Sequence, residues 1–253
     1  MNSVDPTALP PKRIRALTAP LIERNPDIVL TGSKYLCLLP VGHIARQIRI
    51  YDRSVRGYFT LEWRLTGLYV REGQVAPPAY GRPTGLVGRS RKFKPKGEGG
   101  IWDWDDPTMP LDFIYQVETE VLPLLRSLNT FEKIITFILG HYMMGYSVYN
   151  DDKWLFFTEA ALGQFEDAKK RWSIIGPRLE DQLSTRIANF ENPRYLLSDL
   201  SVGEALMKDD RLSLSKLLWE NERGLADIFK LGRYWQPTAF PFQQKLGSVL
   251  DLS

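Results

Sequence analysis

Arginine side chains are the groups in this chain whose number and position point most directly to chemistry. Residues 1–100 contain 12 Arg and 5 Lys, and a guanidinium group binds a phosphate or a carboxylate through two parallel hydrogen bonds. The candidates for binding an anion or a partner lie on a predicted hairpin and in the basic run that follows it: Arg46, Arg49, Arg53, Arg56, Arg89, Arg91, Lys92 and Lys94.

Arg46 is the candidate that the local pattern explains least. It interrupts the alternation of Ile44, Ile48 and Ile50 on the apolar face of a predicted strand. A buried guanidinium without a partner costs several kcal/mol. We therefore expect Arg46 to reach a carboxylate, to reach water at the end of the sheet, or to face a ligand pocket. Arg49 falls on the other face, where contact with solvent is enough to explain it.

Positive and negative charges are separated along the chain. Residues 1–100 contain 17 Lys and Arg against 7 Asp and Glu, and residues 101–253 contain 16 against 23. The first segment therefore has a net charge of +10 and the second a net charge of −7. Either the basic segment binds an anionic partner, or the two segments neutralise each other across an internal interface.

Several common active sites are excluded because the chain lacks the residues to build them. With two histidines, His43 and His141, and one cysteine, Cys37, a zinc site of several His and Cys ligands cannot form. The sequence also lacks the G-x-S-x-G nucleophile elbow, the G-x-x-x-x-G-K-[ST] phosphate loop and the dinucleotide-binding glycine pattern. We predict no cofactor, no metal and no catalytic residue, and we expect Cys37 to be a small buried hydrophobic residue.

An acidic cluster, Asp103, Asp105 and Asp106, has two interpretations. Two of its carboxylates on an extended segment would form a weak magnesium site. Alternatively, the cluster precedes a helix that starts after Pro110, where negative charge stabilises the helix dipole by about 0.3–1 kcal/mol. We favour the helix interpretation.

The N-terminal half predicts a small antiparallel sheet. A short helix is expected over 16–24, and the apolar run 35–41 is too short for most helices, so it predicts a buried strand. Residues 43–51 and 58–65 alternate between apolar and polar side chains, which predicts a half-buried hairpin. Residues 71–106 are rich in Gly, Pro and basic side chains, and they predict one long loop.

Beyond Pro110 the apolar residues recur at helical spacing. Pro123 is expected to kink or end the first helix, and the next helix begins at Asn129 with Glu132 in the capping-box position. Later helices are predicted over 154–172 and from Pro177 onward. The residues predicted for the central core lie on one side of the second helix: Phe131, Ile135, Ile138 and Leu139.

These elements predict an α+β fold, in which a small antiparallel N-terminal sheet packs against a mainly helical C-terminal region. Residues 1–106 form the basic half with the hairpin and the long loop. Residues 107–253 form the helical half, whose aromatic C-terminal tail is expected to lie on the protein surface. We expect the two halves to behave as one cooperative unit.

The sequence therefore predicts a non-catalytic binding or regulatory protein whose basic, arginine-rich surface meets an anionic partner, a protein rather than nucleic acid. A nucleic-acid-binding protein is the first alternative, because Tyr80, Phe93 and Trp102 lie among the basic residues and could stack on bases. An enzyme of unfamiliar type that acts on an anionic substrate is the second.

The cellular setting is predicted from what the chain lacks. No segment reaches the roughly 18 consecutive apolar residues of a membrane span, and a single cysteine forms no intrachain disulfide. We expect a protein of a bacterial-type cytoplasm. The sequence does not indicate its oligomeric state.

Overall fold

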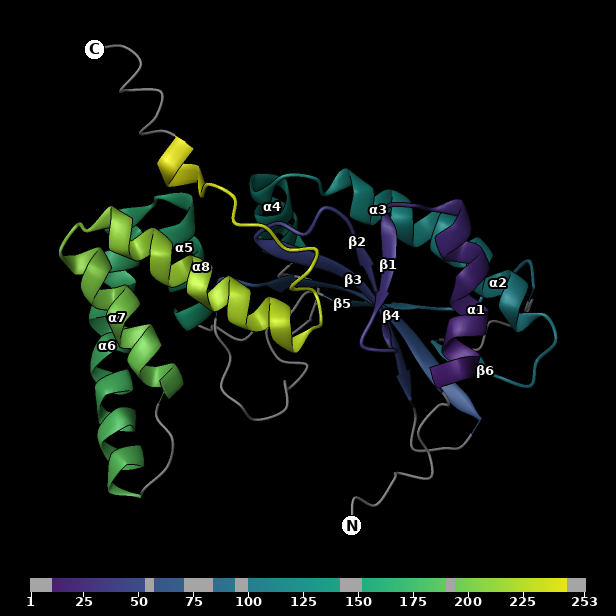
Figure 1. Cartoon of the computed structure of the whole chain (residues 1–253), viewed down its shortest axis with the longest axis horizontal. Coiled ribbons are helices and arrows are strands. Elements are labelled where there is room, and N and C mark those ends of the chain that lie inside the picture. Colours follow the sequence, from purple (N-terminus) through teal and green to yellow (C-terminus); the bar gives the residue numbers. More distant parts are fainter. Residues whose placement is uncertain are drawn as a thin grey trace. The chain divides into compact units, whose positions relative to one another are not determined.

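The structure is a computed structural model that describes residues 11–52, 57–70, 84–93, 100–141, 152–189 and 194–244. It has the predicted α+β fold, with an N-terminal antiparallel sheet followed by a mostly helical C-terminal part (Figure 1). The chain divides into two compact units. The first contains residues 1–66, 82–143 and 229–234, and the second contains residues 67–81, 144–228 and 235–253.

The helices and strands follow one another along the chain with bounds that the sequence predicts only in part. Those of the sheet-containing part are α1 (Pro11–Arg24), β1 (Ile28–Thr31), β2 (Tyr35–Leu38), β3 (Ile44–Asp52), β4 (Tyr58–Gly67), β5 (Thr84–Val87), β6 (Ile101–Asp103), α2 (Met109–Gln116), the π-helix η1 (Val117–Val121), α3 (Leu122–Ser127) and α4 (Phe131–His141). Those of the later helical part are α5 (Asp152–Leu162), α6 (Phe165–Ala188), α7 (Arg194–Met207) and α8 (Arg211–Ile228).

The strands form one sheet in the order β1-β2-β3-β4-β5, and β6 also pairs with β4. β5 pairs with residues 61–64 of β4, and β6 pairs with the adjoining residues 58–60. Both run antiparallel to β4, so together they act as one edge strand that is interrupted by residues 88–100. The prediction of a single loop over 71–106 is therefore wrong at these two short strands.

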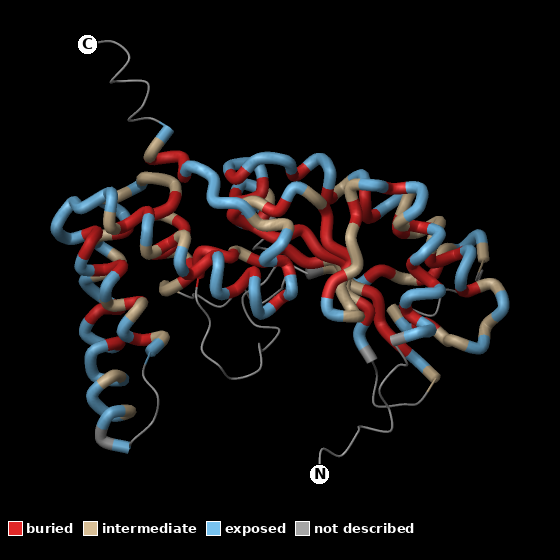
Figure 2. Tube along the Cα trace, viewed as in Figure 1, coloured by how far each residue is buried: buried red, intermediate tan, exposed pale blue. Residues whose placement is uncertain are grey.

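The predicted hairpin is confirmed, because β3 and β4 are neighbours in the sheet. Ile48, Ile50 and Phe59 on its predicted apolar face are buried, and Figure 2 shows buried residues along the central strands. The pattern predicts that the opposite face of the hairpin is exposed to solvent, but part of that face is buried as well. Gln47 and Thr66 on that face are buried too, and the Thr66 hydroxyl donates to Gln47 Oε1 over 3.2 Å.

A continuous helical rod runs from Met109 to Ser127 and contains one π-helical turn, η1. The backbone N–H of Leu122 donates to the carbonyl of Val117, five residues earlier. Pro123 follows directly and has no N–H to donate. The helix nevertheless continues past Pro123 instead of ending there, and the turn just before the proline is wider. Such turns are rare and frequently lie at functional sites.

The core stripe of α4 is confirmed at Phe131, Ile135 and Ile138, which are buried. Leu139 is 46% exposed, so its assignment to the core is wrong. At about 100° per residue, Leu139 lies about 80° around the helix from Phe131, at the margin of the stripe.

In the second unit the helix boundaries differ from those predicted. The helix predicted over 154–172 is divided at Gly163, whose φ of 78° lies in the left-handed region that glycine favours. α6 then continues through Pro177, so the predicted helix start there is wrong. Trp172 of α6 packs so closely on Gly203 of α7 that an added Cβ would lie 2.0 Å from its ring.

The described part of the aromatic C-terminal segment packs within the second unit. Phe240 and Phe242 are buried, and the ring of Phe240 stacks on Trp219 with centroids 6.2 Å apart. The Trp219 indole N–H also donates to the carbonyl of Thr238 over 2.8 Å. None of the helices in the described part of the chain is both long enough and apolar enough to cross a membrane.

Candidate functional site

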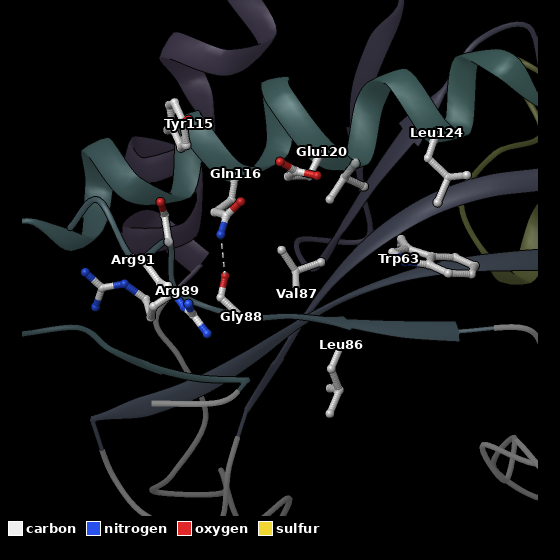
Figure 3. A pocket seen from close by; sticks show the side chains of 12 residues that line it. Trp63, Leu86, Val87, Gly88, Arg89, Arg91, Tyr115, Gln116, Glu120 and Leu124 are labelled. Carbon is white, nitrogen blue, oxygen red and sulfur yellow. Dashed lines mark hydrogen bonds between the residues drawn. The ribbon is translucent and has the colours of Figure 1, made fainter. Parts of the chain in front are cut away.

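A pocket of about 520 Å³ lies in the first unit between β5 and the helical rod. Its volume falls in the range of about 300–1,000 Å³ that is usual for ligand sites. Residues 86–91, from the end of β5 onward, form what we call the β5 wall. The facing helix wall is shown in Figure 3 and consists of Tyr115, Gln116, Glu120, Val121 and Leu124.

Arg89, one of the predicted binding residues, fastens the β5 wall to the protein. Its buried guanidinium donates from Nε to Asp112, from Nη1 to Asp106 over 3.1 Å, and from Nη2 to the Thr108 hydroxyl over 3.0 Å. Burial acts to lower the pKa of Arg89, but hydrogen bonds and charge from Asp112 and Asp106 outweigh it and raise that pKa. Arg89 therefore positions the wall, and its charge is neutralised internally.

Two residues one turn apart on α2 hold the same segment. Asp112, which is fully buried, also accepts a hydrogen bond from the backbone N–H of Ser90 over 3.1 Å. Gln116 Nε2 donates to the carbonyl of Gly88 over 3.0 Å, and Figure 3 marks this bond across the pocket. The β5 wall is thus tied to α2 at residues 88, 89 and 90.

The acidic cluster shapes the turn before α2. Asp106 Oδ1 accepts hydrogen bonds from the backbone N–H and the hydroxyl of Thr108, the N-cap residue of α2. Asp103 Oδ1 accepts a bond from the backbone N–H of Asp105 over 2.9 Å. These contacts support the favoured helix interpretation. Within the ranges that the structure describes, no three His, Cys, Asp or Glu side chains converge in a way that could hold a metal ion.

Arg91 is an exposed cation at one end of the pocket, and Lys92, the next residue along the chain, is exposed as well. Lys92 Nζ lies 4.7 Å from the ring centroid of Tyr115 and 5.6 Å from that of Phe93, as in a cation–π contact. Arg91 forms no ion pair with another described residue, and neither does Glu120, which is exposed on the helix wall. This end therefore offers a guanidinium that no other described residue neutralises, on a segment that Arg89 holds in place.

The other end of the pocket is apolar. Trp63 of β4 packs edge-on against Phe137 of α4, with ring centroids 5.8 Å apart. Its indole also covers Gly85 of β5, where an added Cβ would lie 2.2 Å from the indole nitrogen. Leu124 lies toward the same end of the pocket as Trp63 in Figure 3. The close packing of Trp63 fixes the shape of this end.

Arg46 lies away from the pocket lining and has three backbone partners. Its Nη1 donates to the carbonyls of Leu125 and Leu128 over 3.2 Å each, and its Nη2 donates to the carbonyl of Pro40 over 3.3 Å. The carbonyls of Leu125 and Leu128 lie at the C-terminal end of α3. Carbonyls without a partner in the helix and the helix dipole both favour a cation at this position. Burial lowers the pKa of Arg46. Backbone carbonyls thus take the place of the carboxylate, water or ligand that the sequence led us to expect.

Arg49 lies on the opposite face of β3 from Arg46 and pairs with Glu62 Oε1 over 3.3 Å. The structure therefore does not bring these two arginines together. Three further predicted residues lie outside the described residues: Arg53, Arg56 and Lys94. Two of the predicted residues line the pocket, Arg89 and Arg91, and Lys92 follows them on the same segment after β5.

The aromatic residues predicted to stack on bases have different surroundings. Trp102 is fully buried and its indole N–H donates to the carbonyl of Val87 over 2.8 Å, so it is excluded from stacking on a ligand. Phe93 packs edge-on against Tyr115, with centroids 5.9 Å apart. Tyr80 lies outside the described residues.

Sequence reasoning missed the rest of the pocket. Gln116 and Glu120 are four residues apart, so a helical reading places them on one face, but the spacing does not show what that face meets. Trp63 reads as an ordinary member of an apolar strand face. Only the pairing of β5 with β4 brings Trp63 to the pocket.

Comparisons with known proteins found no matching family model, no matching curated protein and no matching solved structure. Function is therefore inferred from the site itself. The residues that line the pocket include no His or Cys, and Ser90 is the one hydroxyl besides that of Tyr115. The Ser90 hydroxyl accepts a hydrogen bond from the backbone N–H of Lys92. The described lining residues therefore offer polar and charged groups that could contact a ligand, and none of them forms a hydrogen-bonded pair of nucleophile and base.

Proposed function

We propose that this protein is a non-catalytic binding protein that holds an anionic partner at the pocket beside β5. The observation that carries the proposal is Arg91, an exposed guanidinium at the pocket that has no ion-pair partner among the described residues. It follows directly on the segment that the buried pair of Arg89 and Asp112 fastens to α2. A cation on a prearranged segment binds an anion with a smaller loss of conformational entropy.

A protein partner is favoured over nucleic acid by the charges that line the pocket. A nucleic-acid site needs a track of cations, because each neutralised phosphate adds to the affinity. Here Glu120 lies on the helix wall opposite Arg91, and Arg89 is neutralised by its own carboxylates. The described lining therefore combines one exposed cation, Arg91, with one exposed anion, Glu120, and apolar side chains, a mixture that suits the surface of a protein.

We place the action of this protein in the cytoplasm. The support is Cys37, the one cysteine of the sequence, which is fully buried in β2. A stabilising network of disulfides, which is usual in small secreted domains, is therefore absent from the chain.

The test compares two polyanions by fluorescence anisotropy, a labelled polyglutamate and a labelled single-stranded oligonucleotide. We expect polyglutamate to bind more tightly than the oligonucleotide, and Arg91→Gln to weaken polyglutamate binding about tenfold. Arg15→Gln is the matched control, because Arg15 is exposed on α1 and does not line the pocket. Equal loss in both variants, or tighter binding of the oligonucleotide, would contradict the proposal.

A further inference from the structure

We infer that the occupant of this pocket is an extended segment of about four residues within a partner protein. An acidic side chain of that segment meets Arg91, and a large apolar side chain meets Trp63 and Leu124. This inference rests on the proposed function, because it names the partner of the same pocket. Three features carry it: the length of the pocket, the difference between its two ends and its exposed rim.

The length of the pocket matches a short piece of extended chain. The helix wall runs from Tyr115 to Leu124, which at about 1.5 Å per residue is about 13 Å. The β5 wall faces it with residues 86–91, an uninterrupted run of the chain. An extended peptide rises about 3.3 Å per residue, so about four residues span the pocket from end to end.

The two ends of the pocket select different side chains. Arg91 and Tyr115 lie at one end in Figure 3, and Trp63 and Leu124 lie at the other, with Glu120 between them. An exposed guanidinium recognises a carboxylate, whereas a packed indole and a leucine side chain exclude water around an apolar group. The matching segment carries an acidic residue and an aromatic or large aliphatic residue three or four positions apart, at about the spacing of these ends.

The rim of the pocket favours a segment of a larger partner over a small molecule. Arg91 and Glu120, one on each wall, are both exposed, whereas the side chain of Leu86 points away from the helix wall in Figure 3. Small-molecule sites bury most of the ligand surface, whereas a peptide strand keeps one side open to its own protein. The open rim beside Arg91 and Glu120 would be covered by that protein.

Recognition in this arrangement depends on side chains more than on main-chain pairing. The carbonyl of Val87 already accepts a bond from Trp102, and that of Gly88 accepts one from Gln116. Both are on the β5 wall, where an added strand would need them. Selectivity therefore comes from the acidic and the apolar side chain of the bound segment.

The experiment selects random peptides of about eight residues, displayed within a carrier protein, against the full chain. We expect the selected peptides to share an acidic residue and a large apolar residue three or four positions apart. Arg91→Glu should weaken the binding of such a peptide by tenfold or more. Changing the acidic residue of the peptide to lysine should restore binding to Arg91→Glu, because the charges are then exchanged.

Two matched controls separate these contacts from general effects. Leu124→Ala should weaken the peptide several-fold, whereas Leu111→Ala should not, since Leu111 is exposed on α2 and does not line the pocket. Arg15→Glu should leave the affinity unchanged. Circular dichroism and thermal melting establish that each variant is folded.

The results also separate this inference from the function on which it rests. If polyglutamate binding depends on Arg91 but the selected peptides share no acidic and apolar pair, the proposed function stands and the extended segment is refuted. If charge exchange restores no binding, or if peptides bind only through a free C-terminal carboxylate, the inference is also refuted. If neither polyglutamate nor any peptide binds, both proposals fail.

Discussion

Breaking the buried pair of Arg89 and Asp112 should destabilise the first unit strongly. In Arg89→Met, the fully buried Asp112 would keep only the hydrogen bond from the backbone N–H of Ser90. Removing one partner of a buried ion pair typically costs about 3–5 kcal/mol. Because Arg89 also bonds to Asp106 and Thr108, we expect the loss to lie in the upper part of that range.

The double variant Arg89→Met, Asp112→Leu separates the cost of an unpaired charge from the net worth of the pair. An apolar pair of similar volume is often neutral or stabilising relative to a buried ion pair. We therefore expect the double variant to recover about 2 kcal/mol or more relative to Arg89→Met alone, as a coupling energy between residues in contact. Polyglutamate binding should not recover, because the β5 wall would keep only the bond from Gln116 to Gly88 as its attachment to α2.

The assay is urea unfolding followed by circular dichroism and by tryptophan fluorescence, since agreement between the two probes is a test of a single transition. Arg15→Met is the control for removing a guanidinium, because Arg15 is exposed. A free energy of unfolding for Arg89→Met within about 1 kcal/mol of the original chain would refute a stabilising role for the pair. A double variant as unstable as Arg89→Met would refute the argument from the unpaired charge.

Four further predictions test other parts of the structure. Arg46→Met should lower the free energy of unfolding by about 2–4 kcal/mol through the loss of bonds to three carbonyls, without changing polyglutamate affinity; a neutral result in urea unfolding would contradict its role at the end of α3. Ile135→Ala should cost about 2–5 kcal/mol and Leu139→Ala much less, because Ile135 is buried and Leu139 is 46% exposed; equal shifts in melting temperature would count against this difference. Burial raises the pKa of Cys37 to about 12, so iodoacetamide at mildly alkaline pH should modify this thiol only after unfolding, as mass spectrometry can show. A hydrogen bond from Arg126 lowers the pKa of Asp27 below its usual 3.8, so the stability that Asp27 adds is present at neutral pH and disappears as the pH falls through the folded-state pKa. Asp27→Asn should therefore cost about 0.5–1 kcal/mol at neutral pH and nothing in strong acid, and urea unfolding at several pH values would reveal an opposite trend.

Elements with a long periodic pattern could be read from the sequence. The alternation over β3 and β4 predicts the hairpin, because successive side chains on a strand point to opposite faces. The apolar spacing of α4 predicts its buried stripe, and fails only at Leu139 on the margin. The short strands β1, β5 and β6 contain three or four residues each, too few to show a period, so they escaped prediction.

The candidate site was predictable in its charges but not in its geometry. Composition alone singles out Arg89, Arg91 and Lys92 as a basic run after a glycine-rich stretch. It does not show that Arg89 is buried on Asp112 while Arg91 faces solvent. That difference arises because β5 pairs with β4 and the segment after β5 bonds to α2, which brings residues more than twenty positions apart into contact.

The sequence by itself determined the α+β class, the amphipathic faces and the absence of common catalytic motifs, since each follows from residue type and local spacing. Tertiary structure decided which cations are neutralised and which remain available. Arg46 illustrates the difference: its type and position on an apolar face signal a buried guanidinium, but its partners include the carbonyls of Leu125 and Leu128 at the end of α3. Every residue has a backbone carbonyl, so only the packing of α3 on the sheet selects these two as acceptors.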